Sequence, residues 1–77
     1  MRAVRLQSAM IERALFDEGS RELTICFKEG RKYIYSDVPR AVFDALRSAA
    51  SAGAYFNACI KGRFACRTDP ARKYRPG

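Results

Sequence analysis

The clearest hydrophobic pattern in the chain is a strict alternation of apolar and polar positions between Leu23 and Lys28. A two-residue period is typical of a β-strand with one face toward a core and the other toward solvent. A second strand-like run extends from Arg31 to Tyr35, and Glu29-Gly30 stands between the two runs. Glycine adopts positive backbone φ angles at little cost, which suits it to tight hairpin turns. The pattern therefore predicts a β-hairpin with a two-residue loop.

The length of this loop fixes which residues of the predicted hairpin lie opposite each other. With a two-residue loop, Lys28 pairs with Arg31 and Thr24 pairs with Tyr35. The expected core face then carries Leu23, Ile25, Phe27 and Ile34. The expected outer face carries Thr24, Cys26, Lys28, Arg31, Tyr33 and Tyr35. Because the outer face combines aromatic rings with cations, it is a candidate contact surface for another molecule.

Weaker patterns before this hairpin predict one further strand. Residues 3–16 alternate with an interruption near Ser8, where a bend or bulge between two strand pieces is expected. Between residues 10 and 16 both strand faces are partly apolar, so the pattern leaves the inward face open. Residues 17–21 are rich in turn formers and connect this strand to the hairpin. The expected result is a three-stranded antiparallel meander.

Two short helices are expected after the meander. Pro39 suits the first position of a helix, and apolar residues follow it at helical spacing at positions 42, 43, 46, 49 and 50. Ser51 is a candidate cap for a second helix over residues 54–60, which Gly62 would end. Because this second helix is apolar on almost every side, burial on more than one side is expected. Residues 64–66 leave room for a short fourth strand, and the predicted fold class is α+β.

The length of the chain limits the size of its core. Of the 77 residues, residues 1–68 are expected to form one domain and residues 69–77 a disordered basic tail. A domain of this size buries only about 60–65% of its unfolded surface, and a homodimer is one common remedy. No apolar run approaches the ~20 residues of a membrane span, and no signal-peptide pattern follows Met1. We therefore expect a cytoplasmic protein with no membrane partner.

Few residues in the chain are suited to metal binding or catalysis. There are three cysteines without CxxC spacing and no histidine, so no metal, cofactor or disulfide framework is expected. Cys26 and Cys59 are expected to be buried as apolar side chains, and Cys66 to be exposed. The sequence also lacks a glycine-rich phosphate loop and clustered carboxylates. A non-catalytic protein is the expectation.

The excess of positive charge is concentrated near the end of the chain. Fifteen basic and eight acidic residues leave a net charge of +7, and the segment from Lys61 onward contributes +5 of it. A basic segment of this kind is typical of a protein that binds phosphate-rich partners. The alternative is that the charge only keeps the protein soluble.

Several short motifs together resemble the KTSC domain family. They are Tyr33-Ile-Tyr35, Asp37-Val-Pro39 and Tyr55-Phe56-Asn57 in this order, within a similarity that extends over roughly residues 8 to 66. This family takes its name from the carboxyl-terminal extension of some lysyl-tRNA synthetases and also occurs as small free-standing bacterial proteins. The resemblance implies a small α+β module suspected of binding RNA, without established catalysis. The basic tail of this chain and the Ala58-Cys59 pair depart from the family pattern.

Two functions therefore remain open for this chain. The first is binding of DNA or RNA with low specificity, mainly through phosphate contacts. The expected contact residues are Arg2, Arg5, Lys28, Arg31, Lys32, Tyr33, Tyr35, Lys61, Arg63, Arg67, Arg72, Lys73 and Arg75. The second is protein interaction through a homodimer. The pattern also leaves open whether both tyrosines pack under a helix instead, and whether Asn57 bonds a neighbouring backbone turn or a ligand.

Overall fold

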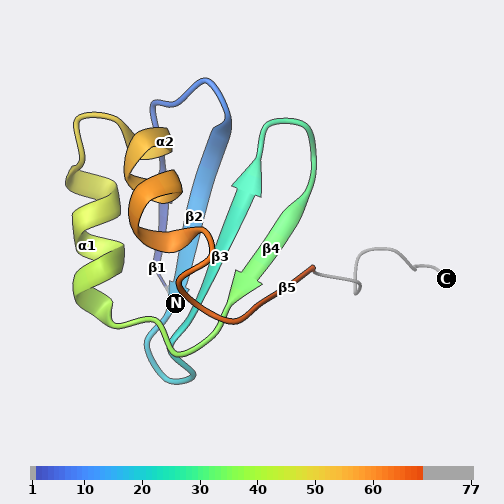
Figure 1. Cartoon of the computed structure of the whole chain (residues 1–77), viewed down its shortest axis with the longest axis vertical. Helices are drawn as coiled ribbons and strands as arrows, with labels where there is room; N and C mark the ends of the chain where they lie inside the picture. Colours follow the sequence, from blue (N-terminus) through green and yellow to red (C-terminus); the bar gives the residue numbers. More distant parts are fainter. Residues whose placement is uncertain (1, 69–77) are drawn as a thin grey trace, which may run out of the picture.

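The computed structural model describes residues 2–68, which form an antiparallel sheet with two helical segments on one side (Figure 1). The sheet has five strands in the order β1-β2-β3-β4-β5. The elements are β1 (Arg2–Arg5), β2 (Ile11–Asp17), β3 (Glu22–Phe27), β4 (Lys32–Tyr35), α1 (Arg40–Ser48), α2 (Ala52–Tyr55), the π-helix η1 (Phe56–Ile60) and β5 (Cys66–Thr68). The α+β class is confirmed, whereas the prediction of a three-stranded meander with room for a fourth strand is wrong because the sheet has five. The expected tail, residues 69–77, lies outside the described residues.

The interruption near Ser8 is a reversal of the chain, which makes β1 a separate strand. The Ser8 hydroxyl accepts hydrogen bonds from the backbone N–H groups of Met10 (3.1 Å) and Ile11 (3.2 Å). These two bonds stabilise the loop between β1 and β2, and the strands then pair with Val4 opposite Ala14. The strand predicted over residues 3–16 is therefore a hairpin.

A β-bulge explains why both faces of β2 look apolar in the sequence. Ile11 lies opposite Phe27, but Arg13 lies opposite Cys26, so Glu12 is an extra residue in β2. The inserted residue changes the face of the strand for everything that precedes it. Ile11 and Ala14 are consequently both fully buried although they are an odd number of residues apart.

The β3–β4 hairpin has a three-residue loop, one residue longer than predicted. The Gly30 N–H donates to the Phe27 carbonyl (2.9 Å), and the Phe27 N–H donates to the Arg31 carbonyl (2.9 Å). This arrangement is a type I turn followed by a residue with positive φ, and Gly30 has a φ of 109°. The pairs are Leu23–Tyr35, Ile25–Tyr33 and Cys26–Lys32. The register predicted from a two-residue loop is wrong by one residue.

This one-residue difference exchanges the two faces of β4. Residues that pair directly in an antiparallel sheet lie on the same face, so Tyr33 and Tyr35 share the core face with Ile25 and Leu23. Ile34, predicted on the core face, lies opposite Thr24 on the other face. The predicted outer face of aromatic and basic residues therefore does not form.

The two helical segments cover the core face of the sheet. Phe43 of α1 stacks on Phe16 of β2 with ring centroids 5.3 Å apart, and Leu46 is fully buried beside it. Pro39 is the N-cap of α1, directly before its first helical residue. The sequence predicted Pro39 as the first residue of the helix itself. The Ser51 hydroxyl accepts from the Ala54 N–H (3.2 Å), which confirms the predicted cap of the second helix.

The second helical segment is buried on one side only, in contrast to the prediction. Ala52, Phe56 and Ile60 are buried, but the alanines at positions 54 and 58 are exposed. Cys59 is exposed too, which contradicts its expected burial, whereas Cys26 is buried and Cys66 exposed as predicted. The Lys61 N–H donates to the Phe56 carbonyl (2.8 Å), a five-residue spacing that defines the π-helix. Gly62 follows with a φ of 77°, the left-handed conformation expected at the end of this helix.

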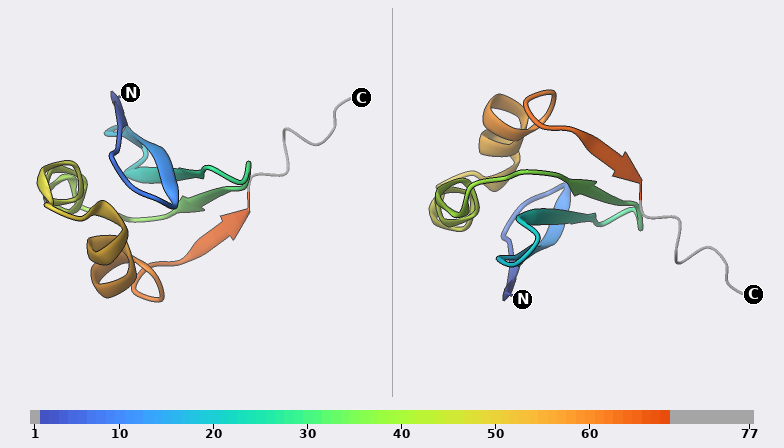
Figure 2. Two further views of the ribbon diagram at one scale, coloured as in Figure 1. Left: turned by 90° about the horizontal axis from the view of Figure 1, so that it is seen from above. Right: turned by 90° about the horizontal axis from the view of Figure 1, so that it is seen from below.

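The sheet is strongly curved, and both helices lie on its inner side (Figure 2). The opposite side carries no helix among residues 2–68, and we call it the open face. Residues on the open face alternate along the strands with those of the core. No helix within residues 2–68 is long and apolar enough to cross a membrane.

Candidate functional site

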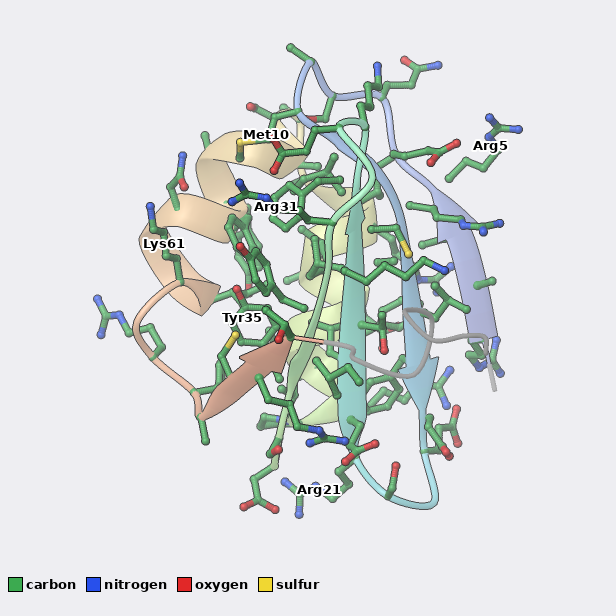
Figure 3. All side chains as sticks on the ribbon, turned by 90° about the vertical axis from the view of Figure 1, so that its right-hand side faces the viewer. Arg5, Met10, Arg21, Arg31, Tyr35 and Lys61 are labelled. Carbon is green, nitrogen blue, oxygen red and sulfur yellow. The ribbon has the colours of Figure 1, made fainter. Side chains whose placement is uncertain are left out.

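A groove of about 510 Å³ lies between the tip of the β3–β4 hairpin and η1. We call it the aromatic groove, and its lining residues are Ala9, Met10, Phe27, Lys28, Glu29, Arg31, Tyr33, Tyr35, Phe56, Asn57 and Lys61. Three segments far apart in the sequence form it: the β1–β2 loop, the β3–β4 hairpin and the second helical segment. Met10, Arg31, Tyr35 and Lys61 surround it in Figure 3. The groove exists because the three-residue loop turns both tyrosines of β4 toward the helices.

Edge-to-face packing holds the aromatic rings of the groove in place. The centroid of the Phe27 ring lies 5.5 Å from that of Tyr33 and 5.6 Å from that of Phe56, at steep interplanar angles. Tyr35 packs in the same way on Phe56, at 5.8 Å. Such pairs stabilise a defined arrangement of rings beyond the burial of their area. Tyr35 is buried, whereas Phe27 and Tyr33 are half-buried and can offer ring surface to a ligand.

The hydroxyl of Tyr35 is a structural group at the inner end of the groove. Burial is the main cause that raises the pKa of Tyr35 above its ordinary value, and a hydrogen bond with the Cys66 thiol of β5 raises it further. The phenol is therefore neutral at physiological pH. Strand pairing of Tyr35 with Cys66 joins β5 to β4, and the exposed ring surface of the groove belongs to Phe27 and Tyr33.

The rim of the groove is positively charged. Lys28, Arg31 and Lys61 are exposed on it, and Glu29 is the carboxylate among the lining residues. The Arg31 guanidinium contacts Glu29 at 3.3 Å and donates to the Tyr33 hydroxyl at 3.4 Å. The hydrogen bond with Tyr33, and then the charge of Glu29, raise the pKa of Arg31. Arg31 thus links the charged rim to the exposed aromatic ring, and the rim keeps an excess of cations.

The π-helix places the amide of Asn57 on the groove. Asn57 is exposed, and within residues 2–68 its side chain forms no hydrogen bond to another protein group. The expected bond to a neighbouring backbone turn is therefore not made. π-Helical turns occur frequently at functional sites. An amide with free donors and acceptors beside aromatic rings can bond the edge of a planar polar ligand.

The remaining residues expected to contact nucleic acid lie elsewhere. Arg2 and Arg67 form ion pairs with Glu18 and Glu22, both at 3.0 Å. Arg5 and Lys32 lie on the open face, and Arg63 is exposed in the turn after η1, outside the lining of the groove. Arg72, Lys73 and Arg75 lie outside the described residues. The structure therefore gathers Lys28, Arg31, Tyr33, Tyr35 and Lys61 in one site.

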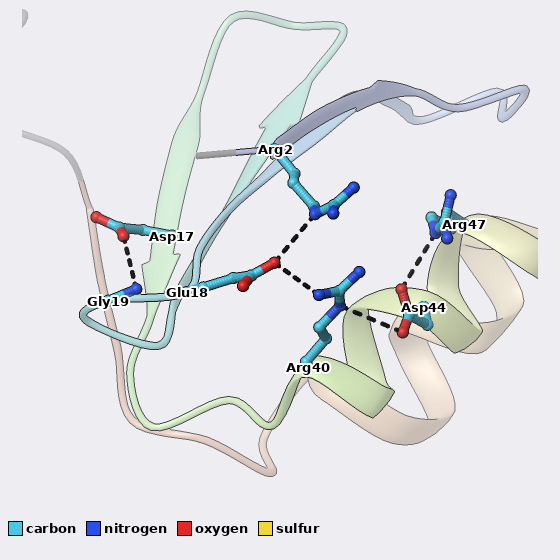
Figure 4. A network of polar contacts seen from close by, with 7 residues as sticks. All are labelled: Arg2, Asp17, Glu18, Gly19, Arg40, Asp44 and Arg47. Atoms are coloured by element: carbon cyan, nitrogen blue, oxygen red, sulfur yellow. Dashed lines mark hydrogen bonds and ion pairs between the residues drawn. The ribbon is translucent and has the colours of Figure 1, made fainter.

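A network of ion pairs neutralises the charges near α1 (Figure 4). One oxygen of Glu18 contacts both Arg2 (3.0 Å) and Arg40 (2.8 Å). Asp44 contacts Arg40 (3.6 Å) and Arg47 (3.2 Å). Because the cations of α1 are already paired with carboxylates, this helix offers little free charge to a polyanion.

Six residues that line the groove are not among the contacts predicted from the sequence, and for one of them, Asn57, ligand contact was one of two open alternatives. They are Ala9, Met10, Phe27, Glu29, Phe56 and Asn57. The sequence predicts Phe27 on the core face and Tyr33 on the opposite face, whereas the observed register brings the two rings together on one face. A signal was nevertheless present, because a polar Asn57 directly after Tyr55-Phe56 in an apolar helix needs a specific reason.

Comparisons with known proteins give one family model, two similar proteins and one similar solved structure. The model of the KTSC domain matches residues 7–64. A protein of Tsukamurella paurometabola is 39% identical over 59 residues, which cover 77% of this chain and 88% of the relative. A lysine–tRNA ligase of Nostoc punctiforme is 36% identical over 58 residues, which cover 75% of this chain and 10% of the ligase. The crystal structure of a KTSC domain protein from Yersinia pestis superimposes with a TM-score of 0.81 at 33% identity, covering 88% of this chain and 96% of that one.

Proposed function

This chain belongs to the KTSC domain family, as its motifs predicted, and we propose that it is a non-catalytic module that binds single-stranded nucleic acid in the aromatic groove. The observation that carries the proposal is the convergence of exposed ring surface, a free amide and three rim cations in one groove. Single-stranded nucleic-acid sites combine these same groups, with rings for bases and cations for phosphates.

Bases would contact the half-buried rings of Phe27 and Tyr33. Stacking of a base on an aromatic side chain contributes about 1–3 kcal/mol and tolerates any base, because every base has a π-face. Asn57 can bond the polar edge of such a base. A volume of about 510 Å³ accommodates a group of this size.

Phosphates on either side of the bound base would meet the rim. Lys28 and Arg31 stand on the hairpin and Lys61 on the helical side, so the cations flank the groove. Contacts of this kind give affinity that falls with salt and carries little sequence information. Low specificity is the expected behaviour.

The relatives favour RNA over DNA as the ligand. The Nostoc punctiforme relative is by name a lysine–tRNA ligase, and the matched segment is a small part of it. A domain that is carried by an enzyme of tRNA, and that also forms most of a small protein in another bacterium, is suited to a general RNA-binding role.

Fluorescence anisotropy with a labelled single-stranded RNA tests the proposal. Affinity should fall steeply between about 50 mM and 200 mM salt. Tyr33→Ala should weaken binding by roughly 1–3 kcal/mol, the value of one stacked base. Lys28→Gln with Lys61→Gln should lower affinity and flatten the salt dependence.

The matched control is Arg47→Gln with Arg63→Gln, which removes the same charge from outside the groove and should change affinity less. Absence of binding at low salt, or equal affinities for wild type and Tyr33→Ala, would remove the groove from the account.

A homodimer is a second proposal, and it rests on a different surface. The outer side of the second helical segment exposes Ala54, Ala58 and Cys59, and β1 is a free edge of the sheet within the described residues. Small apolar residues and an unpaired edge both suit contact with a second copy. Sedimentation at micromolar concentration should show a dimer, and a sharp monomer would oppose it.

A further inference from the structure

The open face of the sheet carries a row of basic residues that the sequence did not reveal as a unit. Strand pairing places Arg5 opposite Arg13, Arg13 opposite Cys26, and Cys26 opposite Lys32. Because paired residues share a face, these four side chains form one line across β1, β2, β3 and β4. We call Arg5, Arg13 and Lys32 the basic row. Arg13 was not among the residues expected to contact nucleic acid.

The basic row lacks a partner within the described part of the protein. Arg5 and Arg13 face each other directly, and like charges in that position destabilise a sheet. Within residues 2–68, no carboxylate lies within ion-pair distance of Arg5, Arg13 or Lys32. The open-face acids Asp17 and Glu22 lie opposite each other at the far end of β2 and β3. Glu22 forms an ion pair with Arg67. An anion from outside the molecule would relieve this repulsion.

The surface next to the basic row is nearly neutral. Leu15, Thr24 and Ile34 form the neighbouring row, and all three are half-buried. Cys26 within the basic row is buried, with the long side chains of Arg13 and Lys32 at the flanking positions. Neighbouring strands are about 4.8 Å apart, so three cations extend over a line of about 14 Å. Repeated anions along one polymer fit such a line better than a single carboxylate does.

Two alternative occupants match this surface less well. A lipid surface is bound by protruding apolar side chains beside cations, but the apolar residues here are half-buried within the sheet. A second copy of the chain would bring the same cations together, because a symmetric contact pairs a patch with itself. The charge therefore selects a polyanion with a regular spacing of phosphates.

We propose that the open face is a second nucleic-acid surface, which holds a phosphodiester backbone through the basic row and reads no bases. The aromatic groove lies on the other side of the sheet, and Figure 3 shows Arg5 and Lys61 on opposite sides of the β-strands. One molecule then contacts two strand segments at once and bridges them. The inference shares its ligand class with the proposed function but does not depend on the groove.

An abasic single-stranded oligodeoxynucleotide isolates phosphate contacts, because it offers phosphates without bases to stack. Variants of the basic row then separate its phosphate contacts from those of the groove rim. Wild type should bind this probe, and Arg13→Gln with Lys32→Gln should lower the slope of log affinity against log salt by about 0.7 for each cation lost. The charge-conserving double variant Arg13→Lys with Lys32→Arg should keep the wild-type slope, because it carries both positive charges. Tyr33→Ala should bind the abasic probe as wild type does.

The matched control for charge is Arg47→Gln with Arg63→Gln, which should leave the slope near that of wild type. Unfolding midpoints of all variants establish that each is folded. Bridging is measured by energy transfer between two differently labelled base-containing oligonucleotides, and the Arg13/Lys32 double variant should lose the transfer while it still binds one oligonucleotide.

Three results would overturn the inference. They are an unchanged slope in the Arg13/Lys32 double variant, an equal change in the matched control, and binding of wild type to phosphatidylglycerol vesicles without binding to the abasic probe. If the groove proposal fails while the basic-row proposal holds, Tyr33→Ala should bind RNA with wild-type affinity. The Arg13/Lys32 double variant should then still lose binding to the abasic probe. The two proposals are thus distinguishable.

Discussion

Gly30 determines which side chains of β4 face the helices. Its φ of 109° completes the three-residue loop, and this loop length sets the Leu23–Tyr35 register. A residue with a β-carbon is strained at such a φ angle. If a substitution at Gly30 prevents the three-residue loop from forming, Tyr33 and Tyr35 lose their position in the aromatic groove.

Replacement of Gly30 by alanine should therefore destabilise the protein although the position is fully open. No atom lies within 4 Å of the added β-carbon, so the cost is backbone strain of about 1–2 kcal/mol. Urea denaturation measures it, with Gly19→Ala as the control because Gly19 does not have a positive φ. Equal stability of Gly30→Ala and wild type would contradict the loop assignment.

Tyr35 connects the groove to the stability of the fold at high pH. Its raised pKa means that the folded state keeps the phenolic proton more firmly than the unfolded state, whose value is near 10. The associated stabilisation is complete below pH 10 and is lost as pH rises toward the folded pKa. The free energy of unfolding of wild type should fall above pH 10.

The free energy of unfolding of Tyr35→Phe should fall less steeply over the same pH range, because phenylalanine has no proton to lose at this position. Denaturation at about pH 9 and about pH 11 measures the difference. Parallel slopes for the two proteins would show that the hydroxyl is not held in a buried, neutral state.

Ser51 controls the second helical segment, which forms one wall of the groove. The α2 helix has only four residues before η1 begins, so its first turn depends strongly on the cap. Ser51→Ala should lower the free energy of unfolding by about 1 kcal/mol. Ser48→Ala is the matched control at the other end of the inter-helix connection, since the Ser48 hydroxyl caps no helix within residues 2–68. Equal losses in both variants would argue against the cap.

At the scale of elements, sequence patterns predicted local structure better than they predicted register. The alternation of residues 23–28, the proline start of α1 and the Ser51 cap all depend on neighbouring residues, and each has its counterpart in the structure. The β3–β4 register depends on whether Lys28 belongs to a strand or to the loop. Both choices place Gly30 in the turn, so the residue types alone do not decide between them.

The aromatic groove was only partly predictable, because some of its residues meet through the fold and not through closeness in the sequence. The sequence predicts Lys28, Arg31 and Tyr33 as a cluster because they are close in the chain, whereas Phe56 and Asn57 join them only through the fold. The bulge at Glu12 had a similar effect, since it exchanges faces within a single strand and cancels the alternation on which the prediction relied.

At the scale of the whole molecule, ion pairing divides the positive charge into used and available parts. Arg2, Arg40, Arg47 and Arg67 are paired with carboxylates at the periphery of the sheet and along α1. On the rim of the aromatic groove Arg31 is paired with Glu29, whereas Lys28 and Lys61 form no ion pair within residues 2–68. The basic row, on the opposite side of the sheet, is also unpaired in this part of the chain. Net charge alone therefore did not locate the surfaces, because the arrangement of acids decides which cations remain available.

The most direct test of the central claim is an amide chemical-shift titration of the full chain with a short single-stranded RNA, which reports binding and its location together. The account predicts saturable shifts that concentrate at residues 28–33 and 56–61, around the aromatic groove, and that weaken in Tyr33→Ala. Shifts confined to residues 69–77, or no shifts at low salt, would contradict the assignment of the groove as the binding site.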